Sequence, residues 1–145
     1  MKYLETMNTV LMIAFLLCYA YQFFYILVPH IKKDKPHRPA KLHRYAVLIC
    51  ARNEEKVIAD LIDSLHGQTY PQDKLKIFVM ADNCTDRTAD VARTAGATVY
   101  ERIDREKVGK GYALDALLGH LVQDEPEGFD GYFVFDADNL LRPDY

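Results

Sequence analysis

Apolar residues follow two different patterns along the chain and divide it into two parts. From Thr6 to Pro29 there is no Asp, Glu, Lys or Arg, and this segment contains the apolar runs VLMIAFLL and FFYILV. From residue 45 onward, short apolar runs alternate with stretches in which apolar residues recur at helical spacing. The first pattern is typical of a helix in a membrane, and the second is typical of an α/β domain.

The uncharged N-terminal segment is long enough to cross a hydrocarbon core of ~30 Å as a helix that rises ~1.5 Å per residue. A cleaved signal peptide normally has an apolar region of ~7–15 residues that ends at a small-residue cleavage site, and we find no such site here. A helix buried in a soluble protein usually has a polar face, and this segment has none. We therefore predict an uncleaved transmembrane anchor in residues 1–30.

A basic linker is predicted at residues 31–44, IKKDKPHRPAKLHR. It carries six Lys or Arg residues against one Asp, whereas only Lys2 and Glu5 are charged before it. By the positive-inside rule, the part of the chain that follows the anchor is cytoplasmic. We therefore expect a plasma-membrane protein, single-pass within this chain, with its soluble part in the cytoplasm. The linker charges either contact anionic lipid or are simply solvated.

Residues 45–145 are predicted to form one α/β domain. Strands are expected at 45–50, 75–80, 97–101 and 131–138, and helices at 52–67, 85–96 and 111–121, with Thr85 as the N-cap of the second helix. This alternation predicts a mainly parallel, Rossmann-like sheet with right-handed crossovers. Ligands of such sheets bind beyond the carboxyl ends of the strands. The polar clusters ARNEE, ADNCTD and DADN follow predicted strands, so they mark the expected site.

The charge balance and the cysteines exclude several classes of protein. Residues 45–145 carry 11 Lys or Arg residues and 19 Asp or Glu residues, whereas a nucleic-acid-binding surface would be basic. We therefore expect no nucleic-acid partner. The three cysteines have no CxxC spacing, which indicates reduced thiols rather than a disulfide framework or a zinc site.

The loops also lack the glycine motifs that bind phosphates. ARNEE contains no GxGxxG motif, and VGKGYA lacks the first glycine and the hydroxyl residue of a P-loop. In an acidic domain, the alternative is a divalent cation chelated by carboxylates. Asp136 and Asp138 are expected on one face of the last strand, where two negative charges ~4 Å apart repel by about 4 kcal/mol at an effective dielectric constant of ~20. A bound cation or a shared proton would relieve this repulsion.

Four segments, taken in order, resemble the nucleotide-binding half of the family-2 inverting glycosyltransferases, which include cellulose, chitin and hyaluronan synthases. These segments are VLICARNEE, FVMADNCTDRT, VGKGYALDALL and FVFDADN, and the resemblance covers residues 45–145. It implies an incomplete GT-A type domain and a nucleotide-sugar donor, with UDP expected as the nucleotide. It also implies Mg²⁺ or Mn²⁺ as cofactor and a glycan or lipid acceptor.

The resemblance assigns nucleoside contacts to the ends of the first two strands. Ala51, Arg52 and Glu54 are expected to line the nucleoside pocket, with Glu54 near the base or ribose. Asp82 is expected to accept a hydrogen bond from a uracil-like edge. From the residues alone, Glu54 could equally be a first-turn partner of the helix dipole, and Asp82 an Asx-turn residue.

The diphosphate contacts are assigned to the later motifs. Lys110 is expected to reach the donor, although it could also be one more solvated charge. Asp136 is expected to contact ribose or metal, and Asp138 to bind the metal that bridges the two phosphates.

The general base of an inverting transfer and the acceptor segment are expected beyond Tyr145, so this chain alone is expected to be an inactive fragment. Two alternatives remain at this point. The hhhDxD pattern also resembles the nucleophile strand of haloacid dehalogenase-type phosphatases, although that strand normally comes early in the chain. A non-catalytic, membrane-tethered nucleotide-binding module is the other.

Overall fold

The computed structural model describes residues 2–31 and 41–145, and residues 1 and 32–40 lie outside the described part. Most of the predicted basic linker therefore falls outside the described residues. The chain divides into two compact units, residues 1–40 and residues 41–145.

Helix α1 runs from Lys2 to Ile31 and is longer than the uncharged segment. By length and composition it is able to cross a membrane, and none of its side chains in the candidate span, Lys2–Val28, is buried. Because an apolar helix with exposed side chains is unfavourable in water, a membrane is a suitable environment for it. A membrane anchor and a signal sequence both satisfy these criteria.

The second unit is built on a parallel sheet of four strands, in the order β3-β2-β1-β4. The strands are β1 (Tyr45–Ala51), β2 (Leu75–Asp82), β3 (Thr98–Arg102) and β4 (Gly131–Asp136). The chain proceeds outward from β1 to β3 and then returns to place β4 on the other side of β1. This reversal makes a topological switch point at the carboxyl ends of β1 and β4, where ligands of such sheets bind. The predicted parallel α/β sheet is thus confirmed.

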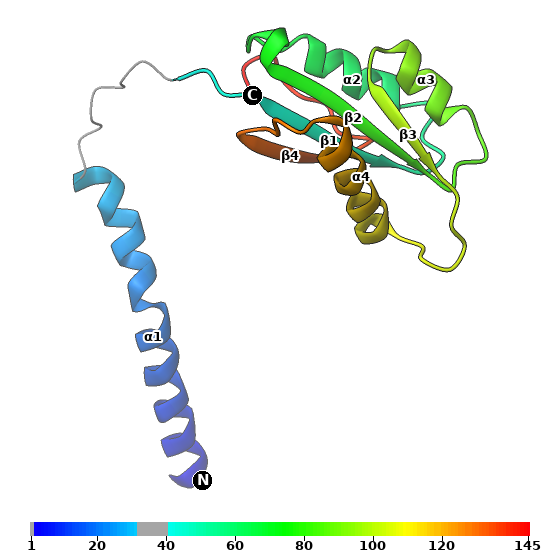
Figure 1. The fold of residues 1–145 in the computed structure, drawn as a ribbon. Coiled ribbons are helices and arrows are strands. Elements are labelled where there is room, and N and C mark those ends of the chain that lie inside the picture. The colour runs from blue at the N-terminus through cyan, green and yellow to red at the C-terminus, as the bar shows by residue number, and fades with distance from the viewer. Residues whose placement is uncertain (1, 32–40) are drawn as a thin grey trace. The chain divides into compact units, whose positions relative to one another are not determined.

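Helices cover both faces of the sheet (Figure 1). Helices α2 (Ile58–His66) and α3 (Thr88–Thr94) pack on one face, where Val47 and Ile49 of β1 are buried. Helix α4 (Lys110–Asp124) packs on the other face against Ala46 and Leu48. Because both faces of β1 are buried, its sequence is almost continuously apolar.

Several element boundaries differ from the sequence predictions. Helix α2 begins at Ile58 rather than at residue 52, because the preceding loop is held by hydrogen bonds to the loop after β2. Thr85 is not the N-cap of α3, which begins at Thr88. Its backbone amide donates instead to Oδ1 of Asn53 at 2.8 Å. Local propensity predicted the helices, but contacts between the loops decide where they start.

Candidate functional site

A small hollow of about 120 Å³ lies beyond the carboxyl ends of β1 and β2, beside the start of α4. It is lined by Cys50, Ala51, Arg52, Asp82, Gly109, Lys110 and Ala113. The fold therefore brings four of the predicted site residues, Ala51, Arg52, Asp82 and Lys110, to one place. Arg52 also lines a larger neighbouring hollow of about 530 Å³, beside Asn83 and Arg105. Because the sequence prediction places a nucleotide-sugar donor here, the smaller hollow is named the donor pocket.

Asp82 is the last residue of β2 and is only 5% exposed. Its Oδ1 accepts hydrogen bonds from Nη1 of Arg102 at 2.6 Å and from Nδ2 of Asn83 at 3.1 Å. Within residues 2–31 and 41–145, no backbone amide donates to this carboxylate and no hydrogen bond reaches its Oδ2. Asp82 is therefore not an Asx-turn residue, and one of its oxygens is available to a ligand.

Arg102 is a site residue that the sequence analysis missed. Its side chain is 13% exposed and forms ion pairs with Asp82 and Asp104. Its Nη2 also donates to the backbone carbonyl of Lys107 at 2.7 Å. No local signal in the sequence indicates this pair, because Arg102 meets Asp82 only through the parallel register of β2 and β3.

Lys110 is the first residue of α4, and its ammonium contacts Oδ1 of Asp136. The two side chains are 48% and 64% exposed, so the pair is open to solvent and to ligands. Gly109, which precedes the helix, has a φ of +128°, a conformation that a residue with a Cβ rarely adopts. The glycine thus permits the sharp turn of the backbone into α4, which brings the first amides of this helix and Lys110 to the edge of the pocket.

Asp136 and Asp138 do not share a strand face, which corrects the sequence prediction. Strand β4 ends at Asp136, where the Asn139 side chain accepts from the Asp136 amide at 3.0 Å and closes a turn. Ala137 is buried in the core, and Asp138 lies exposed in the turn. Asp138 forms no hydrogen bond or ion pair with any part of the chain that the structure describes. The charge that offsets Asp136 here is the Lys110 ammonium.

The carboxylates of the described residues do not by themselves form a complete site for a divalent cation. Among the described residues, no three His, Cys, Asp or Glu side chains come together as a metal site. Mg²⁺ at nucleotide sites usually takes only one or two carboxylates, with phosphate and water oxygens as the other ligands. Asp136 and the unpaired, exposed Asp138 offer hard oxygen donors of this kind, so they fit such an ion when it arrives with a diphosphate.

Glu54 is not placed in the donor pocket. Its backbone amide donates to Oγ1 of Thr88 at 2.8 Å, and its carbonyl accepts from the amides of Val57 and Ile58 at 3.1 and 3.0 Å. It therefore starts the turn that leads into α2, and its side chain does not line the hollow.

Cys50 is a second residue that the sequence analysis missed as part of the site. It lines the pocket and is the register partner of Asp136. Burial raises the pKa of the Cys50 thiol, against the opposing effect of the Lys110 charge. The thiol is therefore neutral at physiological pH and adds no charge to the pocket floor.

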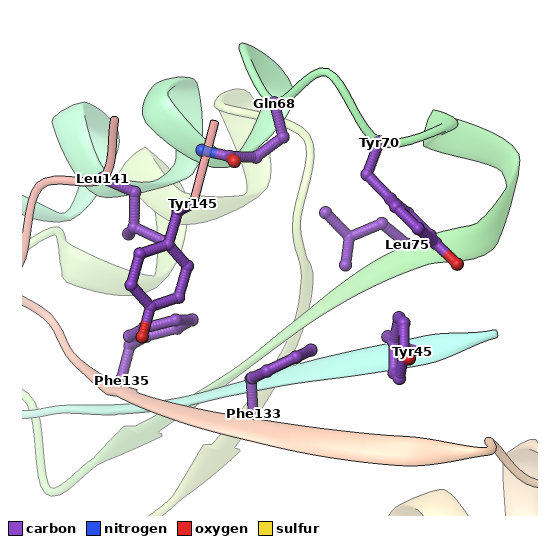
Figure 2. Close-up of a pocket in the computed structure, with 8 residues that line it drawn as sticks. All are labelled: Tyr45, Gln68, Tyr70, Leu75, Phe133, Phe135, Leu141 and Tyr145. Atoms are coloured by element: carbon purple, nitrogen blue, oxygen red, sulfur yellow. The ribbon is translucent and has the colours of Figure 1, made fainter. Parts of the chain in front are cut away.

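An apolar hollow of about 130 Å³ lies on the other face of β4. Figure 2 shows its lining side chains, which are Tyr45, Gln68, Tyr70, Leu75, Phe133, Phe135, Leu141 and Tyr145. Two of its polar side chains are bonded to the protein backbone, since the Gln68 amide donates to the carbonyls of Ser64 and Arg142 and the Tyr70 hydroxyl donates to that of His43. Since side chains alternate along a strand, Phe135 and Asp136 point to opposite faces. This hollow is not part of the donor pocket.

Comparison with protein families gives a match over most of the chain. The model described as "Glycosyltransferase like family 2" matches residues 43–145. Among curated proteins, 4,4'-diaponeurosporenoate glycosyltransferase of Staphylococcus aureus (strain USA300) is 47% identical over 66 residues, which are 46% of this chain and 16% of that protein. The protein of the same name from Staphylococcus haemolyticus (strain JCSC1435) is 35% identical over 95 residues, covering 63% of this chain and 24% of that protein. The chain thus spans less than a quarter of the length of these relatives.

Solved structures show the same fold. Mannosyltransferase PcManGT from Pyrobaculum calidifontis, in complex with GDP-Man and Mn²⁺, matches with a TM-score of 0.61 at 25% identity, over 88% of this chain and 39% of that one. Glucosyl-3-phosphoglycerate synthase from Mycobacterium tuberculosis, with Mn²⁺, UDP and phosphoglyceric acid, matches with a TM-score of 0.52 at 25% identity, over 73% and 40%. S. aureus TarS 1-349 with UDP-GlcNAc, at 22% identity and a TM-score of 0.54 over 69% and 28%, shows the fold alone.

Proposed function

This chain belongs to the glycosyltransferase-like family 2, and on that premise we propose that residues 45–145 are the donor-binding part of a membrane-anchored, metal-dependent glycosyltransferase. The enzyme transfers a sugar from a nucleotide-sugar, with UDP as the nucleotide, to a glycan or lipid acceptor. Residues 1–30 are the anchor, residues 31–44 the basic linker, and the donor-binding part faces the cytoplasm. The observation that carries the proposal is the donor pocket, which places a buried carboxylate and a lysine at one strand edge.

Asp82 is proposed to recognise the nucleobase. Its Oδ2 is not used by the described residues, while Arg102 and Asn83 hold Oδ1 in a fixed direction. A carboxylate oxygen held in this way accepts an N–H donor, such as the imide of uracil. Ala51 and Arg52 form the adjoining wall. Glu54 lies outside the pocket, so we assign it only a backbone role in the loop that follows β1.

The phosphates are proposed to lie at the start of α4. The first amides of a helix have no partner within the helix, and the helix dipole favours an anion there. Lys110 adds a full positive charge to this position. Since Lys110 contacts Asp136, an arriving diphosphate would compete for its ammonium.

Asp136 and Asp138 are proposed to hold Mg²⁺ or Mn²⁺ together with the diphosphate. The bound ion would supply charge neutralisation for the departing nucleotide. The proposal is supported by the hard oxygen donors of the two side chains and by the Mn²⁺ in the complexes of PcManGT and of the M. tuberculosis synthase.

The acceptor and the general base are features of a complete transferase, so they are proposed for the whole protein. The curated relatives are named as 4,4'-diaponeurosporenoate glycosyltransferases, which favours a lipid acceptor over a glycan. The general base is proposed to lie beyond Tyr145. The phosphatase alternative is not retained, because the family model spans all four site motifs.

Calorimetry on the full chain in detergent tests the proposal. UDP is expected to bind in the presence of Mn²⁺ and to bind much more weakly after chelation. Asp138→Asn should abolish this metal dependence. Asp144→Asn is the matched control, because Asp144 is also exposed and lies close in sequence but is paired with Arg142. Failure of the unmodified chain to bind either UDP or GDP with Mn²⁺ would exclude the proposal.

A further inference from the structure

Two asparagines at the carboxyl edge of the sheet have left-handed backbone conformations. The φ angles are +58° at Asn53 and +53° at Asn83, and no other non-glycine residue in the described ranges has a positive φ. Asn53 lies two residues after the end of β1, and Asn83 directly follows β2. Such conformations are unfavourable for residues with a Cβ, although asparagine tolerates them best, and they persist where the surroundings impose them.

Each asparagine side chain accepts hydrogen bonds from a neighbouring loop. Asn53 binds the loop after β2, and Asn83 binds the loop after β3. Oδ1 of Asn53 accepts from the backbone amide of Thr85 at 2.8 Å and from its hydroxyl at 3.3 Å. Oδ1 of Asn83 accepts from the amide of Asp104 at 2.9 Å. The end of β1 is thus tied to the loop after β2, and the end of β2 to the loop after β3.

The residues next to these asparagines line the donor pocket. Ala51 and Arg52 precede Asn53, and Asp82 precedes Asn83. Asn83 also contacts Asp82 directly, since its Nδ2 donates to Oδ1 at 3.1 Å. The left-handed turns therefore decide in which direction the pocket wall and the Asp82 carboxylate face.

We propose that Asn53 and Asn83 are positioning residues, which hold Arg52 and Asp82 in the geometry that binds the nucleotide. This inference rests on the proposed function, because it assigns their role to the same pocket. Asn53 acts through the hydrogen bond from Thr85, and Asn83 acts through Asp104 and Asp82.

The amino end of the sheet offers a matched control. There the Asp130 carboxylate accepts from the backbone amide of Arg44 at 2.8 Å, which ties two segments together as Asn53 does. Asp130 precedes β4 and does not line the donor pocket. Removing its side chain should lower the free energy of unfolding without changing nucleotide affinity.

Two substitutions separate the backbone requirement from the hydrogen bond. Asn53→Gly keeps the left-handed conformation at no steric cost but removes the acceptor. Asn53→Asp keeps an acceptor oxygen and still tolerates the left-handed region. With UDP and Mn²⁺ as the probe, Asn53→Gly and Asn83→Gly should each weaken binding about tenfold or more, because each removes two side-chain hydrogen bonds. Asn53→Asp should stay within about threefold of the unmodified chain, and Asp130→Ala should not change affinity.

A readout without ligand tests the inference even if no nucleotide binds. Hydrogen exchange of the Thr85 amide, relative to the buried β1 amide of Val47, should be faster in Asn53→Gly by about tenfold. The ratio should be unchanged in Asn53→Asp and Asp130→Ala. If the unmodified chain binds neither UDP nor GDP, the proposed function fails, and the exchange ratio still decides whether Asn53 holds the loop.

The proposal is overturned if Asn53→Gly binds UDP or protects the Thr85 amide as well as the unmodified chain does. It is also overturned if Asn53→Asp behaves like Asn53→Gly, since the acceptor oxygen would then not be the cause. Equal loss of affinity in Asp130→Ala would show that general destabilisation, rather than positioning, weakens binding.

Discussion

Lys110 and Asp136 form an ion pair across the carboxyl edge of the sheet, joining the first residue of α4 to the last residue of β4. The two residues are 26 positions apart in the sequence. Both side chains are substantially exposed, so the pair contributes little to stability and remains free to exchange partners.

Replacing Lys110 by Ala should therefore separate binding from stability. The free energy of unfolding should change by less than about 1 kcal/mol, as is usual for exposed ion pairs. Affinity for UDP with Mn²⁺ should fall by about tenfold or more, because the positive charge beside the phosphates is lost. Urea unfolding and calorimetry measure the two effects. Lys107→Ala is the control, since Lys107 lies in the loop just before α4 but does not line the pocket, and an equal effect there would contradict a specific role for Lys110.

Arg102 should matter for stability as well as for binding. Its guanidinium is the ion-pair partner of the buried Asp82 carboxylate. Arg102→Met leaves this carboxylate without its counter-charge and should cost about 3 kcal/mol in the free energy of unfolding. Denaturant unfolding measures the loss. Arg93→Met provides the comparison, because Arg93 pairs with Glu101 and Asp90 at the surface and should cost less than about 1 kcal/mol.

Thr88 should make the stability of the domain depend on pH. Its hydroxyl donates to Asp86 at 2.5 Å, and this hydrogen bond is the main reason that the pKa of Asp86 lies below its ordinary value of 3.8. A carboxyl whose pKa is lower in the folded state stabilises the protein above the unfolded pKa, and this contribution is lost as the pH falls through the folded pKa.

Thr88→Val removes the hydroxyl, so it should destabilise the domain most at about pH 6 and progressively less as the pH falls toward about 3. Urea unfolding across this range measures the difference. Thr94→Val is the control, because the Thr94 hydroxyl donates to the backbone carbonyl of Asp90 and its effect should not vary with pH. A constant difference for Thr88→Val would show that Asp86 is not involved.

Helix α1 should retain the full chain in membranes through an alkaline carbonate wash, whereas a chain that begins at residue 41 should be washed out. Leu16 lies near the middle of the candidate span. Leu16→Arg should weaken insertion, because a charged residue at the centre of a spanning helix costs about 3 kcal/mol. Leu16→Ala should have little effect. Recovery of a shortened, soluble product would instead identify α1 as a cleaved signal sequence.

The sequence predicted the architecture well because the relevant signals are local. Apolar residues on both faces of residues 45–50 indicate a central parallel strand, as observed, and helical spacing in residues 57–65 indicates a covering helix, which the structure has at Ile58–His66. The polar clusters after the strands also lie together at one edge of the sheet, as the parallel arrangement predicted. Ala51, Arg52, Asp82 and Lys110 were placed in one pocket because the strands are parallel and their carboxyl ends meet there.

The errors arose where contacts between distant loops override local preference. Asp138 leaves the strand because Asn139 closes a turn at Asp136 and Ala137 enters the core. The binding role predicted for Glu54 stays a prediction, although its amide is bonded to Thr88, 34 residues away, and its side chain does not line the pocket. Neither contact has a signature in the residues around it.

By itself, the sequence determined the long apolar helix, the alternation of strands and helices, and the edge at which the polar residues gather. The spacing of apolar and charged residues indicates which side of a helix or strand is buried. This spacing is visible within a few residues of the chain. Only the tertiary structure decided the partners at that edge, namely Arg102 for Asp82, Lys110 for Asp136, and Thr85 for Asn53. Those partners are 20 to 32 residues apart. Their meeting depends on strand order, register and loop packing, which are properties of the whole folded domain.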